Sequence, residues 1–198
     1  MPDASVTLRE LLGLGQQPAP LKESALIMID CQNTYRSGIM ALTGVEEALL
    51  EARKLLELAR TLKIPIFHVR HDAGAGSPYD INAEVGAFAK EVAPHRGEPV
   101  ITKNLPNAFF QTDLDQQLKA IGIHNIVLAG FMTHMCINST AHGGFALGYA
   151  PTVVASTTAT RPLQAANGKV VSAQEVQDAA IASTRDLYAT IIDRVSDF

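Results

Sequence analysis

An apolar run, a short irregular turn and a helical pattern follow one another between Ile126 and Tyr149. The run that ends at Gly130 has the continuous apolar character of a strand buried on both faces. From Cys136 onward, apolar residues recur at helical spacing until Gly148 ends the pattern. The stretch therefore predicts a buried strand that turns sharply into a helix, with a cysteine as the first residue of that helix.

The same alternation of strand and helix runs along the rest of the chain. Short apolar runs predict six strands, at residues 25–29, 66–70, 100–102, 126–130, 152–155 and 188–192. Helical patterns are found at residues 7–12, 45–62, 82–92, 112–121 and 136–148, and from Ser172, where Glu175 completes a capping box. Such alternation is typical of a three-layer, doubly wound α/β fold, with a mostly parallel sheet and helices on both faces. Right-handed crossovers favour the strand order 3-2-1-4-5-6.

Length and composition limit what the protein can be. A chain of 198 residues without an internal repeat or linker predicts a single domain, residues 1–198, with residues 1–24 as an extension that packs on it. A net charge of −4 without a Lys/Arg-dense block argues against nucleic acid as a partner. No apolar run reaches membrane-spanning length, and the N-terminus lacks the layout of a signal peptide. We therefore expect a cytoplasmic protein, without a membrane partner, whose two cysteines are reduced.

Three residues with chemical potential lie at the carboxyl ends of predicted strands. Asp30 ends the first strand, Lys103 ends the third, and Cys136 follows the turn after the fourth. In this topology the strand order reverses between strands 1 and 4, and ligands bind in the crevice there. Each residue also has an ordinary structural explanation: a loop-capping aspartate, a surface lysine and a small buried hydrophobe. Their convergence on one crevice favours a catalytic site.

The expected chemistry is that of a thiol nucleophile. A cysteine at a helix start lies near the positive end of the helix dipole, which favours the thiolate. Lys103 would lower the pKa of the thiol further, and Asp30 is a candidate base. His134 and His142 flank the cysteine and leave papain-like Cys–His chemistry as a rival, but no asparagine or aspartate partner is identifiable for either histidine.

The segments ALIMIDCQ, ITKNLPNAF and LAGFMTHMCI around these three residues resemble the isochorismatase-like cysteine hydrolases in order, spacing and local context. The resemblance covers the chain from Ala25 to about Ile192, and its specific part is Gly-x-x-Thr-x-x-Cys followed by a helix that ends in Gly-Tyr. It implies a catalytic triad of Asp30, Lys103 and Cys136.

The resemblance also implies features around the triad. An oxyanion hole would be formed by the backbone N–H groups of Met132 and Cys136, and the Phe131–Met132 peptide bond would be cis. Relatives are commonly dimers or tetramers, so we expect a homodimer or homotetramer. The loops at this end of the sheet would bind a small-molecule substrate, and we predict that the following residues contact it: Gln32, Tyr35, His71, Phe109 and Thr133.

Other residues are assigned by elimination. Cys31 should point away from the face that Asp30 uses, because side chains alternate along a strand, so we expect it to be structural. His68 and His71 face opposite sides and lack further ligands, and no strand leads into Gly-x-Gly-x-x-Gly. We therefore expect no metal and no cofactor. Gly143 and Gly144 interrupt a helix, which close packing on the sheet or on another subunit would explain.

The sequence thus predicts a hydrolase that cleaves an amide or ureido C–N bond through a covalent thiol intermediate. Hydrolysis of a vinyl ether, as in the isochorismate reaction, is an alternative that uses the aspartate and needs no cysteine. A ligand-binding protein of the same fold without turnover is the other alternative. The substrate itself is not encoded in any motif.

Overall fold

The computed structural model of the protein describes residues 5–198. Its main sheet has six strands, all parallel, in the order β3-β2-β1-β4-β5-β8. The strands are β1 (Ser24–Ile29), β2 (Ile66–His71), β3 (Val100–Lys103), β4 (Asn125–Phe131), β5 (Ala150–Ala159) and β8 (Thr190–Ile192). The predicted strand order is confirmed, with β8 as the sixth strand.

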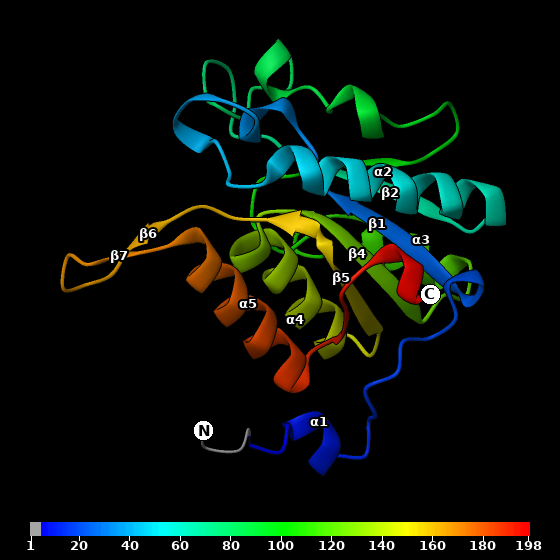
Figure 1. The fold of residues 1–198 in the computed structure, drawn as a ribbon. Helices are drawn as coiled ribbons and strands as arrows, with labels where there is room; N and C mark the ends of the chain where they lie inside the picture. Colours follow the sequence, from blue (N-terminus) through cyan, green and yellow to red (C-terminus); the bar gives the residue numbers. More distant parts are fainter. Residues whose placement is uncertain (1–4) are drawn as a thin grey trace.

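Helices cover both faces of this sheet, as Figure 1 shows. Helix α2 (Val45–Leu62) packs on one face, in a core cluster that includes Leu26 and Met28 of β1. Ile27 and Ile29 of the same strand belong to a second cluster on the other face. The helices on that side are α3 (Leu114–Ala120), α4 (Asn138–Ala146) and α5 (Ala173–Leu187). Burial of alternate β1 side chains on opposite faces explains why its apolar run is continuous.

Local signals placed most helix ends correctly. Helix α2 has the predicted bounds, and Ser172 caps α5 through the expected capping box with Glu175. Cys136, in contrast, is not the first residue of a regular helix. A wider π-type turn spans Thr133–Ile137, and α4 begins after it. Residues 82–92 contain two short 3-10 turns, Glu84–Gly86 and Lys90–Val92, in place of the predicted helix.

Strand β5 and the segment after it differ from the prediction. The strand continues through the Ser- and Thr-rich residues 156–159, which were expected to be loop. A two-stranded antiparallel hairpin follows, formed by β6 (Leu163–Gln164) and β7 (Val170–Val171). It extends away from the body of the molecule (Figure 1). Asn167-Gly168 lies in its turn, and this dipeptide is a strong hairpin signal that the sequence prediction missed.

The described part of the N-terminal extension, residues 5–24, contacts the C-terminal part of the domain, and residues 1–4 lie outside the described residues. Helix α1 (Leu8–Leu11) packs beside α5 and is held by Arg9, whose guanidinium donates to the Leu187 carbonyl and the Thr190 hydroxyl. Leu11 is 70% exposed, so the apolar face of α1 is not covered by the domain. The expected homodimer or homotetramer stays a prediction.

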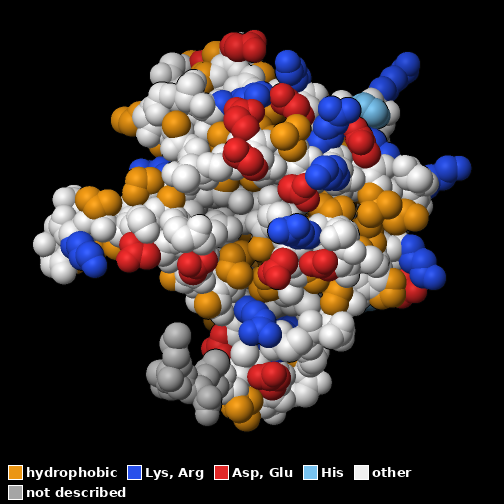
Figure 2. Space-filling model, viewed as in Figure 1, with side chains coloured by type: hydrophobic (Ala, Val, Ile, Leu, Met, Phe, Trp, Pro, Cys, Tyr) orange, Lys and Arg blue, Asp and Glu red, His pale blue; other side chains and the backbone are white. Residues whose placement is uncertain are grey.

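On the face shown in Figure 2, basic and acidic side chains are interspersed. Within residues 5–198 no helix has the length and apolar character that crossing a membrane requires.

Candidate active site

The three predicted catalytic residues meet at the carboxyl edge of the sheet. Asp30 follows β1 with a φ of 50°, a left-handed conformation that aspartate tolerates better than most residues and that turns the chain away from the strand. Lys103 is the last residue of β3, and Cys136 lies in the turn after β4. Gly130, just before this turn, has a φ of 122°, and a Cβ there would overlap the Ile29 carbonyl oxygen. β1 and β4 can approach this closely only with glycine at that position.

Lys103 connects the other two residues. Its Nζ lies 2.7 Å from Asp30 Oδ2 and 3.4 Å from Cys136 Sγ. The long side chain spans the end of β2, which separates β3 from β1 in the sheet. The exposed fractions are 0% for Asp30, 1% for Lys103 and 4% for Cys136, so the three groups interact where bulk water screens them little.

Burial and mutual charge determine the ionisation of these groups. Burial raises the pKa of Asp30, although the charge of Lys103 opposes the rise. Burial lowers the pKa of Lys103, but attraction by Asp30 and Cys136 outweighs it, and the net pKa is raised. Burial and then the charge of Asp30 raise the pKa of Cys136, against the effect of Lys103. The expectation of a lowered thiol pKa is therefore wrong, because burial and the charge of Asp30 outweigh the effect of Lys103 on Cys136.

The turn between β4 and α4 has the predicted backbone. The Phe131–Met132 peptide bond is cis, as expected. Within the described part of the chain, the Met132 N–H donates to no protein acceptor. Thr133 is fully buried, and its hydroxyl has no partner among residues 5–198. These free polar groups fit the oxyanion hole and substrate contact predicted here, which stay predictions.

Aromatic rings form one wall beside the triad. Tyr35 is 1% exposed and makes edge-to-face contacts with Tyr79 at 5.8 Å and with Phe131 at 5.6 Å. Charges on Asp30 and Cys136 contribute to raising the pKa of both tyrosines, after burial, so both rings are near the triad. The sequence prediction included Tyr35 and missed Tyr79 and Phe131. Neither of the missed residues carries a local signal, because a loop and a strand end bring them here.

Three further residues were predicted to contact the substrate, and their surroundings differ. His71 lies beside the triad, with its Nδ1 3.3 Å from Lys103 Nζ. Gln32 is fully buried, and its amide is used by the backbone of His71 and the carbonyl of Gly86, so it has no free N–H for a substrate. Phe109 stacks on Tyr149 at 5.3 Å and packs in the core cluster that includes Cys136.

The glycine pair in α4 is explained by close packing. A Cβ on Gly143 would collide with the Asn107 side chain. A Cβ on Gly144 would lie 3.0 Å from Ile126 of β4 and 3.1 Å from the Phe109 ring. The loop that follows Lys103 thus lies directly on α4, and Thr140 of that helix accepts a hydrogen bond from the Ala108 N–H. Packing on the sheet, one of the two expected explanations, is confirmed for Gly144, whereas Gly143 packs on the loop after Lys103.

Cys31 and His68 lie outside the group formed by Asp30, Lys103 and Cys136. Cys31 is buried, and burial followed by the charge of Asp30 raises its pKa. His68 is bonded to Glu98 on the far side of β2 from the triad, 2.8 Å away. In residues 5–198 no three His, Cys, Asp or Glu side chains are grouped so that they could hold a metal ion.

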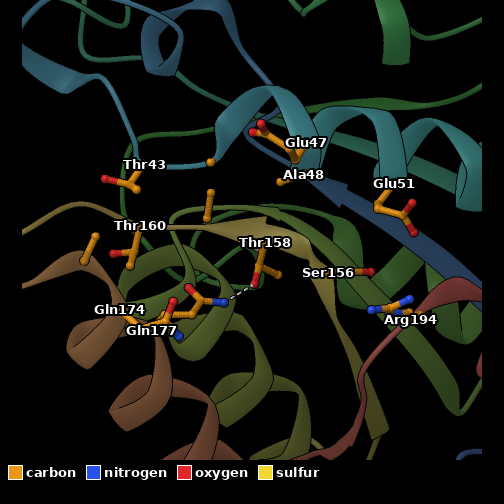
Figure 3. Close-up of a pocket in the computed structure, with 13 residues that line it drawn as sticks. Thr43, Glu47, Ala48, Glu51, Ser156, Thr158, Thr160, Gln174, Gln177 and Arg194 are labelled. Carbon is orange, nitrogen blue, oxygen red and sulfur yellow. Dashed lines mark hydrogen bonds between the residues drawn. The ribbon is translucent and has the colours of Figure 1, made fainter.

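A cleft of about 470 Å³ lies next to the site, between α2, the end of β5 and the start of α5 (Figure 3). Hydroxyl, amide and charged side chains line it, among them Glu47, Glu51, Thr158, Gln177 and Arg194. None of the triad residues lines it. Its connection with the site is Thr160, whose hydroxyl is hydrogen bonded to the ring of His134 in the turn.

Arg161 lies at this edge and forms no ion pair with any of residues 5–198. Arg161 follows Thr160, and its buried Nε has no hydrogen-bond partner within the described residues. Its charge contributes to lowering the pKa of His134, after burial, and opposes the rise in the pKa of Tyr79. A positive charge therefore lies near both the turn that holds Cys136 and the aromatic wall.

Comparison with known proteins gives one consistent result. A model of the Isochorismatase domain matches residues 24–195. The crystal structure of an isochorismatase from Pseudomonas putida KT2440 is 34% identical and superposes with a TM-score of 0.94, over 98% of this chain and 99% of that one. An uncharacterized isochorismatase family protein of Bacillus subtilis, YddQ, is 39% identical over 85% of this chain and 94% of its own length. The ureidoacrylate amidohydrolase RutB of Stutzerimonas stutzeri is 29% identical over 75% of this chain and 76% of its own.

The two cysteines should differ in reactivity. We expect iodoacetamide to alkylate Cys136 at least about tenfold faster than Cys31 near neutral pH, because only Cys136 has an ammonium group beside it to stabilise the thiolate. Peptide mass spectrometry over a time course measures both rates. Cys31→Ser is the control and should keep the fast adduct. Faster labelling of Cys31 would show that Cys136 is not the activated thiol.

Proposed function

The chain belongs to the isochorismatase family of hydrolases, and within it we propose that the protein is a cysteine hydrolase that cleaves an amide or ureido C–N bond of a small molecule. The observation that carries the proposal is the position of Lys103 Nζ between Asp30 Oδ2 and Cys136 Sγ. A thiol, a carboxylate and a buried cation in contact are the groups that nucleophilic attack on a carbonyl needs. The similarity to a ureidoacrylate amidohydrolase supports C–N cleavage as the reaction.

In the first half-reaction the C–S bond forms, the C–N bond breaks, and one proton passes from Sγ through Asp30 to the departing nitrogen. Asp30 takes the thiol proton, and Lys103 pairs with the resulting thiolate in place of the carboxylate. The thiolate Sγ then attacks the carbonyl carbon, and the negative charge moves to the carbonyl oxygen. The developing oxyanion is stabilised by backbone N–H groups, for which Met132 and Cys136 are the candidates. When the tetrahedral intermediate collapses, the C–N bond breaks and Asp30 returns its proton to the departing nitrogen.

The second half-reaction restores the enzyme. Asp30, again ionised, takes a proton from water as the water oxygen attacks the thioester or thiocarbamate carbon. The C–S bond then breaks, the product leaves as an acid or carbamate, and the Asp30 proton returns to Sγ. In each step Asp30 exchanges a proton with the Cys136 thiol, the departing nitrogen or the attacking water. The buried site therefore never carries an unpaired charge.

The substrate, we propose, carries an acidic group near the scissile bond. Arg161 provides a guanidinium without an ion-pair partner among residues 5–198, near the turn that holds Cys136 and the aromatic wall. Such a group is well suited to bind a carboxylate in a bidentate manner. The substrate of RutB, ureidoacrylate by its name, combines a ureido group with an acid. A ureido acid or an amide of similar size therefore fits both the triad and Arg161.

Vinyl ether hydrolysis is the second candidate, because the similar Pseudomonas putida protein is described as an isochorismatase. That reaction needs an acid to protonate carbon and has no essential use for a thiol. A ligand-binding protein without turnover would have no need for a buried triad in mutual contact.

Substitutions should separate these functions. With an amide or ureido substrate, Cys136→Ala and Lys103→Ala should each lower kcat by roughly three orders of magnitude or more, since each removes a group that the covalent step requires. Intact-protein mass spectrometry on quenched wild-type enzyme should detect an acyl adduct on Cys136. If Cys136→Ala keeps near-full activity on the true substrate while Asp30→Asn loses it, the reaction is vinyl ether hydrolysis.

A substrate panel tests the role of Arg161. Ammonia release should be faster from ureido acids than from the matching neutral methyl esters, and Arg161→Gln should raise KM for the acids by about 10- to 100-fold. KM for the esters should change little. Arg96→Gln is a matched control, since Arg96 is exposed beside Pro65 and Ile66, at the opposite end of the sheet. Equal effects of Arg161→Gln on acids and esters would contradict the assignment.

A further inference from the structure

The ammonium group of Lys103 has three acceptors, one more than the triad supplies. Asp30 Oδ2 lies at 2.7 Å, Cys136 Sγ at 3.4 Å and His71 Nδ1 at 3.3 Å from Nζ. An ammonium has three N–H donors and no lone pair, so the contact with His71 is a hydrogen bond only when Nδ1 is unprotonated. The geometry thus requires a neutral imidazole with its proton on Nε2.

We propose that His71 is a positioning residue for the reaction, whose neutral imidazole accepts one ammonium proton and thereby directs the other two toward Asp30 and Cys136. The inference rests on the proposed function, because it assigns His71 a role in the same thiol chemistry. It differs from the substrate contact expected for His71 from the sequence, since His71 acts through Lys103.

The fold holds His71 in this orientation from several sides. His71 and Lys103 are register partners on the neighbouring parallel strands β2 and β3, so their side chains leave the sheet on the same face. The Gln32 side chain accepts from the His71 N–H at 2.8 Å and donates to its carbonyl at 3.0 Å. The imidazole also makes an edge contact with the Tyr79 ring at 4.8 Å. Because these contacts restrain both the backbone and the ring of His71, its Nδ1 stays directed at the Lys103 ammonium.

The charges around His71 keep it neutral near neutral pH. Burial and then the positive charge of Lys103 lower its pKa, while Asp30 and the adjacent Asp72 oppose the shift. Tyr79, the remaining titratable neighbour, is neutral there because its own pKa is raised by burial. Acid therefore converts Nδ1 from an acceptor into a donor that faces an ammonium. The site then loses one hydrogen bond and gains a like charge beside Lys103.

Reactivity of Cys136 is the direct readout, because the thiolate depends on Lys103 and alkylation needs no substrate. His71→Leu removes the acceptor, and we expect iodoacetamide to react with Cys136 about 10- to 100-fold more slowly near neutral pH. His71→Asn places an amide oxygen near the position of Nδ1 and should keep the rate within about threefold of wild type. His124→Asn is the control, since His124 is exposed at the opposite end of the sheet, where its carbonyl pairs with Ala150.

The pH profile distinguishes positioning from simple structural support. In wild type, reactivity should fall as acid protonates His71, and in His71→Asn this fall should move to lower pH because an amide does not titrate. Where His71→Leu does not fold, His71→Gln replaces it, since its longer side chain misplaces the acceptor and should be slow. With a substrate in hand, kcat should fall in the slow variants while KM stays nearly constant.

Two results would overturn the inference: wild-type alkylation rates in a folded His71→Leu at every pH, or an equal loss in His71→Asn and His71→Leu. Failure of the proposed function is a separate result. It would appear as absence of turnover of any amide or ureide by wild type, while the alkylation rates still follow the predicted order and support the role of His71.

Discussion

The candidate active site depends on one buried ammonium group. Lys103 is 1% exposed and lies in contact with a carboxylate and a thiol, with a single positive charge to balance a negative one. Charges removed from water are costly unless each is paired, so Asp30 and Cys136 are most stable with one negative charge between them. A proton given up by one is therefore taken by the other, and their ionisation is a property of the pair. In the proposed reaction Asp30 accepts this proton when the nucleophile is activated, and it donates the proton when the leaving group departs.

The rest of the fold holds the lysine in place. Lys103 begins on β3, two strands away from β1, and its side chain passes the end of β2, where His71 is its register partner. The loop after Lys103 is packed on α4 through the glycine pair, and Gly130 allows β1 and β4 to approach closely under the turn. These close contacts place a carboxylate, an ammonium and a thiol from three separated segments within hydrogen-bond distance.

The sequence was most informative where the signal is local. Continuous apolar runs and helical spacing predicted the strands, the order of the sheet and helix α2, and the strand ends predicted which residues would meet. The pKa of Cys136 was predicted in the wrong direction, because burial of its thiol comes from packing of distant segments. Tyr79 approaches the triad from a loop without a pattern, and nothing local marks it. The β6–β7 hairpin had a local signal in Asn167-Gly168. The signal was missed because the residues before it are mostly polar and do not have the apolar pattern of a strand.

The central claim is that Asp30 and Cys136 hold one negative charge between them beside Lys103. Titration of the Cys136 thiol in the Asp30→Asn variant tests this claim. Ultraviolet absorbance of the thiolate, followed against pH in a Cys31→Ser background, gives the pKa of Cys136 with and without the carboxylate charge. We expect a lower thiol pKa in Asp30→Asn than in the parent, because Cys136 becomes the counter-ion of Lys103. Turnover of amides or ureides should also be lost, because the leaving nitrogen has no proton donor. An unchanged or higher thiol pKa in Asp30→Asn would show that Asp30 and Cys136 do not share one negative charge.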